Sequence, residues 1–312
     1  MIFMPNIKRL AAQATLALLK QLLVRLEPGD RSWLARHCVS ERQSRDVRAL
    51  VDFGYGTIRG WKNSEFDIEV NGESILLARL AALSPRVVFD VGANVGEWSL
   101  AALKHLPEAT VHAFEIAPAT ALKLVQNTDG VSERLVINRS GLSDVKGDFT
   151  LYYTPESDTA SSLVAKAMEV AASNHGFTQI QELKVPVTTG DDYIRQYDLP
   201  RIDFLKIDVE GAELSVLNGF KNAFRNNMIN LVQFEYGLVN LKTRVFLEDF
   251  YAFFSEHGFV VGKLLPQGVG FKPYALEDED FIGLNFIACR KDRKDLITAI
   301  GCEPLSLSTF PH

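Results

Sequence analysis

Residues 87–98 of the chain are VVFDVGANVGEW, and this stretch predicts a strand, a tight turn and the start of a helix. Val87–Val91 is rich in β-branched and aromatic residues, as in a strand that is buried on both faces. Gly92 and Gly96 flank Asn94, and all three residue types tolerate the backbone angles of a sharp turn. Such a turn brings backbone N–H groups and a helix N-terminus close to a bound ligand.

The acid at position 90 narrows the choice of ligand. A turn that holds a pyrophosphate should not carry a carboxylate beside it, because like charges repel. The dinucleotide fingerprint also requires G-x-G-x-x-G, whereas this turn has G-x-N-x-G. S-adenosylmethionine has a sulfonium and an ammonium group, so an acid suits it. We therefore expect this cofactor at Asp90, Gly92, Ala93, Asn94 and Gly96, with Gly92 and Asn94 at its methionine portion. The alternative is a packing turn without a ligand.

Composition and charge are those of an ordinary globular protein. The 312 residues are 47% hydrophobic and 23% charged, and this length fits one large domain with a smaller appendage. The net charge of −6 argues against a nucleic-acid binder, whose affinity depends on neutralising phosphates. Cys38, Cys289 and Cys302 are few and widely spaced, which indicates a reducing interior and neither a disulfide framework nor a zinc site. We therefore expect a cytoplasmic protein.

The first 70 residues are interpreted as an N-terminal helical cap or lid. Residues 1–26 predict a helix with a narrow polar stripe, and Lys20 interrupts its apolar run too early for a membrane span. No signal-peptide cleavage site follows. This helix packs on the catalytic domain or a second copy, or it contacts the inner face of a membrane peripherally. Its charged residues are all basic: Lys8, Arg9, Lys20 and Arg25.

Strands alternate with helices from residue 71 to residue 290, which is the pattern of an α/β fold with a mostly parallel sheet covered on both faces. A polar loop at 154–162 would form a mobile flap. Phe66–Val70 also alternates like a strand, and residues 291–312 are expected to form a short charged segment and a loose tail. The main expected strands are Val87–Val91, Thr110–Phe114, Arg134–Asn138, Ile202–Glu210, Ile229–Phe234, Phe259–Leu265 and Gly283–Cys289.

Acidic residues stand at the ends of four of these strands. Ligands of open α/β sheets bind at the carboxyl ends of the strands, so we interpret the set as functional, although each acid alone would be an ordinary capping or solvated residue. Glu115 can accept both hydroxyls of a ribose, and Leu142 and Ser143 would lie along an adenine. The acids are Asp90, Glu115, the pair Asp208 and Glu210, and Glu235.

Four segments together resemble the FkbM-type methyltransferases. They are FDVGANVG at 89–96, FE at 114–115, LKIDVEGAE at 205–213 and QFEY at 233–236. VPVTT at 185–189 and NFIA at 285–288 also match, and the resemblance covers residues 66–290. One departure is Gly190, where the family more often has leucine; it concerns the packing of the following helix.

The resemblance implies a seven-stranded, Rossmann-like class I methyltransferase sheet with an antiparallel last strand. It also implies S-adenosylmethionine as the methyl donor and O-methylation of a hydroxyl on a sugar, glycolipid or polyketide-like acceptor. The expected partner is therefore a small molecule or a glycan. Nucleic acid is not expected, and the oligomeric state stays open.

Methyl transfer to an aliphatic hydroxyl requires a base, because this group is a poor nucleophile until its proton leaves. Asp208 is the first candidate and Glu235 the second. Glu210 would position the acceptor. Lys206 would hold the carboxylates ionised or polarise the oxygen, and it is equally a structural ion-pair partner. No histidine lies in a motif at a strand end, so a histidine base is not expected.

Two alternatives to this mechanism remain. Asp208, Glu210 and Glu235 have the hard oxygen ligands that Mg²⁺ prefers, and a metal would lower the pKa of the acceptor. We expect no metal, because Asp208 and Glu210 share one face only if their strand continues. The second alternative is an inactive methyltransferase-fold binding or scaffold protein, since a fold alone does not establish catalysis.

Overall fold

The computed structural model describes residues 6–131, 133–157 and 161–305. The chain divides into two units, Met1–Ile58 and Arg59–His312, each of which is described by itself. The boundary falls inside the region interpreted as an N-terminal cap. Within the described residues, no helix is both long enough and apolar enough to cross a bilayer.

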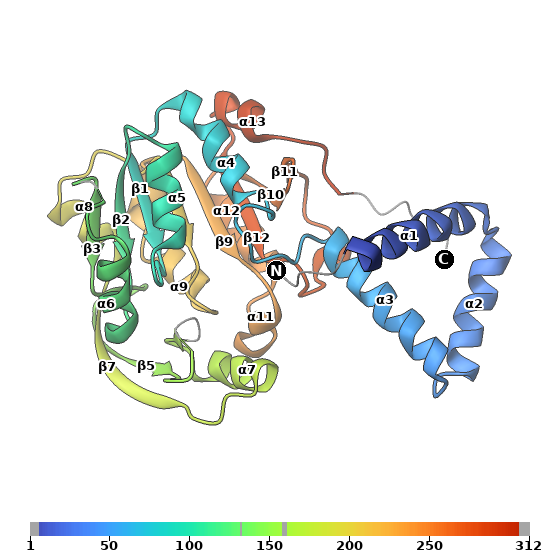
Figure 1. Ribbon diagram of the computed structural model, residues 1–312. Coiled ribbons are helices and arrows are strands. Elements are labelled where there is room, and N and C mark those ends of the chain that lie inside the picture. The colour runs from blue at the N-terminus through green and yellow to red at the C-terminus, as the bar shows by residue number, and fades with distance from the viewer. Residues whose placement is uncertain (1–5, 132, 158–160, 306–312) are drawn as a thin grey trace. The chain divides into compact units, whose positions relative to one another are not determined.

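The described residues of the N-terminal unit lie mainly in helices, drawn in blue in Figure 1. They are α1 (Asn6–Arg25), α2 (Pro28–Ser40) and most of α3 (Arg45–Trp61). Proline at the first position of α2 has its backbone angle already set for a helix. The carboxylate of Asp30 accepts the backbone N–H of Glu27 at 3.0 Å, which satisfies one of the donors that a helix start leaves unpaired.

The main sheet has the strand order β3-β2-β1-β8-β9-β12-β10-β11. Strands β3, β2, β1, β8 and β9 are parallel, and β12 runs antiparallel to both β9 and β10. The expected α/β architecture, with its mostly parallel sheet and antiparallel last strand, is confirmed. The strands are β1 (Val87–Val91), β2 (Thr110–Phe114), β3 (Leu135–Asn138), β8 (Phe204–Ile207), β9 (Leu231–Glu235), β10 (Phe259–Leu265), β11 (Gly268–Phe271) and β12 (Asn285–Arg290).

Helices cover both faces of this sheet (Figure 1). Side chains alternate along each strand, so Phe89 and Val91 of β1 join the core beneath α8, α9, α10 and α12. Val88 points the other way and packs with α4, α5 and α13. The helices are α4 (Glu73–Leu80), α5 (Glu97–His105), α6 (Pro118–Asn127), α8 (Gly190–Gln196), α9 (Glu213–Asn218), α10 (Lys221–Arg225), α12 (Leu247–Glu256) and α13 (Lys294–Ile300).

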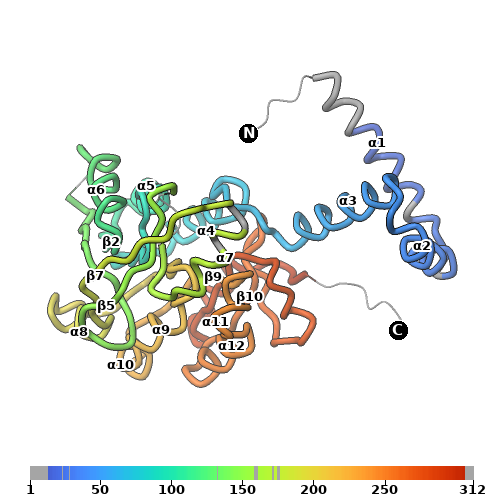
Figure 2. The backbone as a smooth tube through the Cα atoms, turned by 90° about the horizontal axis from the view of Figure 1, so that it is seen from below, coloured from blue at the N-terminus to red at the C-terminus, as the bar shows by residue number. Residues whose placement is uncertain are grey.

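A second, smaller sheet in the order β4-β7-β5-β6 was not expected in this form. Its long strands β5 and β7 pair antiparallel from Gly147↔Val187 to Tyr153↔Gln181, and Figures 1 and 2 show them side by side. Residues 158–160 of the expected flap lie outside the described residues. The remaining elements are β4 (Gly141–Leu142), β5 (Gly147–Tyr153), β6 (Ser161–Ser162), α7 (Ala165–His175), β7 (Gln181–Thr188) and α11 (Leu238–Thr243).

The structure corrects four sequence expectations. Residues 294–300 of the expected charged segment and loose tail form helix α13, because Leu296 and Ile300 pack into the core. Phe66–Val70 is not a strand, because the side chain and carbonyl of Asp67 accept the N–H groups of Glu69 and Val70 in a local turn. Strand β8 ends at Ile207 and does not run on to residue 210. The main sheet has an eighth strand, β11, because a two-residue hairpin after Leu265 returns the chain beside β10.

Gly190 is required by the packing of the first turn of α8. A Cβ atom at this position would lie 2.1 Å from the ring of Phe220, which is fully buried. We predict that Gly190→Ala lowers the free energy of unfolding by about 1–3 kcal/mol through overpacking. The matched control is Gly147→Ala, whose Cβ would meet the ring of Phe149 at an ordinary 3.7 Å. Urea unfolding of both variants measures the difference, and equal losses would contradict the steric explanation.

Candidate active site

A cavity of about 490 Å³ opens at the carboxyl ends of β1, β2, β8 and β9, within the Arg59–His312 unit. Its wall contains most of the residues that the sequence singled out: Gly92, Ala93, Asn94, Glu115, Leu142, Lys206, Asp208, Glu210 and Glu235. It also contains residues that sequence reasoning missed, among them Asn71, Glu73, Trp98, Ser162 and Asn285.

The glycine turn after β1 is fixed from both sides. The backbone N–H groups of Gly92 and Ala93 both donate to the carbonyl of Phe114 at 2.9 Å. Gly92 has a φ of 86°, and a Cβ there would lie 1.7 Å from the carbonyl oxygen of Asp208. The loop after β8 therefore crosses directly over the turn, which only glycine allows at this position.

Asn94 presents an unsatisfied acceptor in this turn. Its backbone adopts a left-handed φ of 49°, which asparagine tolerates better than most residues. Its side-chain oxygen is buried and has no hydrogen-bond partner within the described structure. The indole N–H of Trp98, which also lies in the cavity wall, is likewise buried and has no hydrogen-bond partner within the described structure. Buried polar atoms without a partner are uncommon, and at a cavity wall they suggest contacts with a ligand.

Glu115 stands at the end of β2 beside the glycine turn. Its carboxylate accepts the N–H of Asn94 at 2.9 Å and the N–H of Ala117 at 2.7 Å. Burial raises the pKa of Glu115 to about 7, although these hydrogen bonds favour the charged form. Each oxygen of an ionised carboxylate has a further lone pair, so Glu115 can still accept hydrogen bonds from a ligand.

Three of the expected cofactor residues have other neighbours. Asp90 is fully buried behind the wall, where it accepts the hydroxyl of Ser99 at 2.6 Å. Ser143 is buried beside β4, and its backbone N–H donates to the carbonyl of Thr188. Gly96 precedes α5 with a φ of 96°, and a Cβ there would meet Leu124 at 2.6 Å. These residues shape the turn and its surroundings; Leu142 lines the cavity itself.

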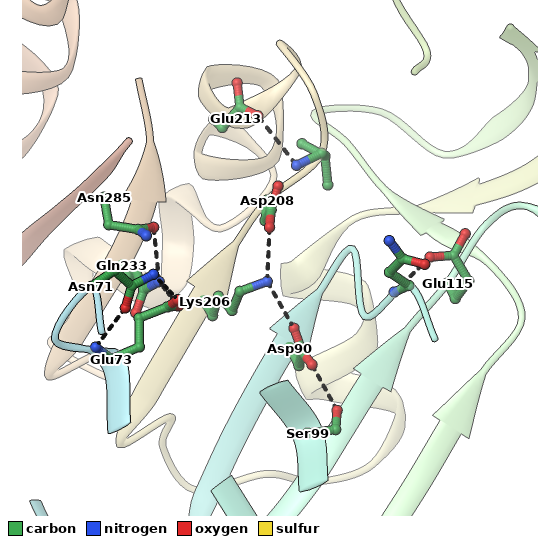
Figure 3. Close-up of polar contacts among 12 residues, drawn as sticks. Asn71, Glu73, Asp90, Ser99, Glu115, Lys206, Asp208, Glu213, Gln233 and Asn285 are labelled. Carbon is green, nitrogen blue, oxygen red and sulfur yellow. Dashed lines mark hydrogen bonds and ion pairs between the residues drawn. The ribbon is translucent and has the colours of Figure 1, made fainter. Parts of the chain in front are cut away.

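A row of polar side chains crosses the sheet beneath the cavity (Figure 3). Asp90 of β1 is the register partner of Lys206 of β8, and Lys206 is the partner of Gln233 of β9. Residues in register on neighbouring strands point to the same face, here the face covered by α4 and α5. The Lys206 ammonium lies 3.3 Å from Asp90 and 3.1 Å from Asp208.

Lys206 is a buried cation held by carboxylates. Burial would lower its pKa, but the charges of Asp208, Asp90 and Glu73 together raise the pKa above its usual range. Its ammonium also lies 5.8 Å from the centre of the Trp98 ring. Lys206 therefore stays charged at every physiological pH and neutralises part of the acidic wall.

Glu73 is a site residue that sequence reasoning missed. It begins α4, is 4% exposed, and accepts hydrogen bonds from the side-chain amides of Asn71 at 2.7 Å and Gln233 at 2.5 Å. Gln233 also donates to Asn285 at 2.9 Å. Burial raises the pKa of Glu73, while Lys206 lowers it. The available signal was a glutamine inside the apolar run of β9, because a buried amide needs polar partners.

The segment after β8 carries Glu210 in its loop and Glu213 at the first position of α9. Glu210 has a left-handed φ of 54°, and the hydroxyl of Ser162 donates to its backbone carbonyl at 2.7 Å. Burial and the charge of Asp208 raise the pKa of Glu210 to about 8. Glu213 accepts the N–H of Gly211 at 2.9 Å, and burial raises its pKa to about 7.

Glu235, at the end of β9, completes the acidic wall. Burial, followed by the charges of Asp208 and Glu210, raises the pKa of Glu235 well above its usual range. Like charges in one cleft favour protonation of some members. Within the described residues, no three histidine, cysteine, aspartate or glutamate side chains are grouped so that they could hold a metal ion. Such a wall attracts a cation and offers several groups that can accept a proton.

The strand order, with the antiparallel β12 inserted between β9 and β10, is that of a class I methyltransferase sheet. The glycine turn and the acid at the end of β2 lie under its cavity. A family model described as the methyltransferase FkbM domain matches residues 90–261, which is more than half of the chain. The chain belongs to the FkbM methyltransferase family.

Several curated relatives are named as methyltransferases. Hexuronic acid methyltransferase AglP from Haloferax volcanii is 28% identical over 153 residues, which cover 49% of this chain and 57% of AglP. The 31-O-demethyl-FK506 methyltransferase FkbM from Streptomyces tacrolimicus is 32% identical over 158 residues, which cover 44% of this chain and 60% of that protein. The chain thus matches less than two thirds of the length of these relatives.

Solved structures also align with part of the chain, at low sequence identity. The O-methyltransferase TomG from Streptomyces achromogenes, solved in complex with S-adenosylmethionine, has a TM-score of 0.39 and 10% identity over 70% of this chain and 78% of TomG. Fibrillarin from Aeropyrum pernix has a TM-score of 0.35 and 11% identity over 73% of this chain and 76% of that chain.

We predict that Lys206→Met lowers the free energy of unfolding by about 3–5 kcal/mol at neutral pH, because it leaves the buried carboxylate of Asp90 without its cation. The matched control is Lys263→Met. Burial lowers the pKa of Lys263 to about 8, so the folded state gains little from this charge and no comparable loss is expected. Urea unfolding followed by circular dichroism compares the two. Equal losses would show that Lys206 contributes through packing alone.

Proposed function

We propose that this chain transfers a methyl group from S-adenosylmethionine to a hydroxyl oxygen of a sugar, glycolipid or polyketide-like molecule. Membership of the FkbM family supports methyl as the group that is transferred. The observation that carries the choice of donor is the cavity corner where the carboxylate of Glu115 and the unpartnered amide oxygen of Asn94 stand beside the glycine turn. This corner offers hydrogen-bond acceptors to hydroxyl and ammonium groups.

The residues of this corner fit the parts of the donor. Glu115 would accept the ribose hydroxyls with the lone pairs that its backbone contacts leave open. Leu142 gives an apolar wall for the adenine, and Asn94 with Gly92 and Ala93 would meet the methionine portion. When bound, the donor supplies an electrophilic methyl group. Side chains of this protein would remove the proton of the acceptor hydroxyl and orient the acceptor.

Asp208 is the proposed base. Its side chain lines the cavity, is 31% exposed, and is held by the Lys206 ammonium at 3.1 Å. A carboxylate in this position can take the proton of a hydroxyl as the new carbon–oxygen bond forms. Glu235 is the second candidate. It lines the same cavity, but burial raises its pKa, so it can accept a proton only once a bound cation has favoured its ionised form. Glu210 would orient the acceptor, because much of the rate of an in-line transfer comes from alignment.

Two observations support the proposed class of acceptor: the names of the curated relatives and the polar residues in the wall of the cavity. AglP is named for a hexuronic acid and the FkbM protein for a hydroxyl position of FK506, so both names fit hydroxylated small molecules. The cavity wall also contains Asn71, Glu73 and Asn285, whose amides and carboxylate suit hydroxyl groups. A small molecule or a glycan is therefore the proposed partner.

We predict that Glu115→Gln weakens binding of S-adenosylmethionine by about tenfold to a hundredfold, the usual loss for hydrogen bonds to a charged group. Glu97→Gln is the matched control, because Glu97 also lines the cavity but is exposed. Isothermal titration calorimetry measures both. Donor affinity of the unmodified protein should rise with pH through about 7, as Glu115 ionises, and Glu115→Gln should remove this rise.

The titration also tests the alternatives. Absence of any binding heat at high donor concentration would contradict the proposal and favour a binding or scaffold protein. Equal affinities of Glu115→Gln and Glu97→Gln would reject the ribose assignment and leave the donor itself in place. A fluorescence change with NADH would instead indicate nicotinamide chemistry.

We predict that Asp208→Asn lowers kcat by about 10²–10⁴, the usual contribution of a general base, while donor affinity stays nearly unchanged. Transfer of a labelled methyl group from S-adenosylmethionine to a panel of glycosides, hexuronic acids and secondary alcohols measures kcat. Asp148→Asn, on the exposed part of β5, is the control. If Asp208→Asn kept full turnover and Glu235→Gln lost it, Glu235 and not Asp208 would be assigned as the base. Loss of activity on adding EDTA would support the metal alternative.

A further inference from the structure

The N-terminal unit leaves its large apolar side chains in solvent. Among the described side chains of Met1–Ile58, Val47 is the one apolar side chain that is buried, at 5% exposure. Monomeric proteins rarely expose so many large apolar groups within one short segment, and such patches mark surfaces for binding. More than a third of the surface is exposed for Leu16, Leu18, Leu22, Val24, Trp33, Val39, Leu50, Val51, Phe53, Tyr55 and Ile58.

Helix α3 shows how this exposed surface is arranged. Val47, Leu50, Val51 and Ile58 recur at intervals of three, four and seven residues, so they form one stripe along the helix. Three of the four are about half exposed, at 46% to 54%. Arg48 lies beside this stripe on the helical wheel and is exposed, so its aliphatic stem can cover apolar surface while its charge stays in a polar layer.

The charge of the unit differs in sign from that of the remaining chain. Met1–Ile58 contains nine lysines and arginines and five acids, a net charge of +4, whereas Arg59–His312 contains 24 and 34, a net charge of −10. Within the described part of the chain, its exposed basic side chains form no ion pair with an acid. These side chains are Lys20, Arg25, Arg31, Arg36, Arg42, Arg45 and Arg48.

We infer that Met1–Ile58 docks on an anionic lipid surface. Exposed apolar side chains beside unpaired basic ones are what an interfacial helix needs, because the former enter the acyl boundary and the latter attract acidic headgroups. Trp33, 58% exposed on α2, is of the type that prefers this boundary. The charge complementarity selects anionic over neutral lipid. The surface extends over α1, α2 and α3.

The test is flotation of the full chain with vesicles. We expect it to float with vesicles of equal parts phosphatidylcholine and phosphatidylglycerol, to float far less with phosphatidylcholine alone, and to be released by salt, which screens the attraction. Failure to float with either vesicle, or equal flotation with both, would overturn the inference.

Two kinds of variant locate the contact. Lys20→Glu combined with Arg25→Glu should weaken binding to the anionic vesicles at least about tenfold, given the usual contribution of each basic residue. The matched control is Lys221→Glu combined with Arg225→Glu, the same change at exposed positions of α10. Similar losses in both variants would show a non-specific effect of net charge and would overturn the assignment to this unit.

Leu50→Gln combined with Val51→Gln tests the apolar part. It should weaken vesicle binding by about tenfold, because two apolar side chains no longer enter the lipid. Leu122→Gln with Val125→Gln, at exposed positions of α6, is the control and should bind as the unmodified chain does. Circular dichroism confirms folding of each variant.

Sedimentation equilibrium tests the competing occupant, a second copy of the chain. A dimer that Leu50→Gln with Val51→Gln dissociates, without vesicle binding by the unmodified chain, would assign this surface to self-association and overturn the lipid inference.

Discussion

The ammonium of Lys206, held between Asp90 and Asp208, is the interaction on which the rest of the site depends. A lysine in the middle of a buried strand is tolerable only where carboxylates surround it. Asp90 fixes it from the neighbouring strand and is itself fixed by Ser99 on α5. The same ammonium also forms an ion pair with Asp208, which lines the cavity. Strand register thus connects the buried core to the group proposed to remove the proton.

The acidic wall fits the cation that the proposed methyl donor would bring into this cavity. Glu115 and Glu210 have pKa values raised to about 7 and about 8 by burial, so the ligand-free protein holds protons there near neutrality. A group whose pKa is raised on folding stabilises the fold below its usual pKa and loses this contribution as the pH rises through the raised value. A bound cation favours the ionised carboxylates, so ligand binding and proton release are linked. Binding of the proposed donor would therefore leave more of these carboxylates ionised.

The sequence predicted the sheet well, because its strands are apolar runs that end in glycine or in acids. The turn at 87–98 and the position of the acids at the strand ends could be predicted because both directly follow such apolar runs. The expected strand at Phe66–Val70 failed, since Asp67 forms a local turn that alternation does not reveal. The role of Glu73 was missed because its partner, Gln233, lies 160 residues away in the chain. Contacts of this kind depend on which strands are neighbours in the sheet, and strand order cannot be read directly from a single sequence.

The hydroxyl of Ser162 joins the small second sheet to the backbone carbonyl of Glu210. Glu210 is one of the few residues other than glycine with a left-handed backbone, a conformation that neighbouring contacts must maintain. A single hydroxyl of the second sheet therefore helps to hold the backbone conformation that places the Glu210 carboxylate at the cavity wall.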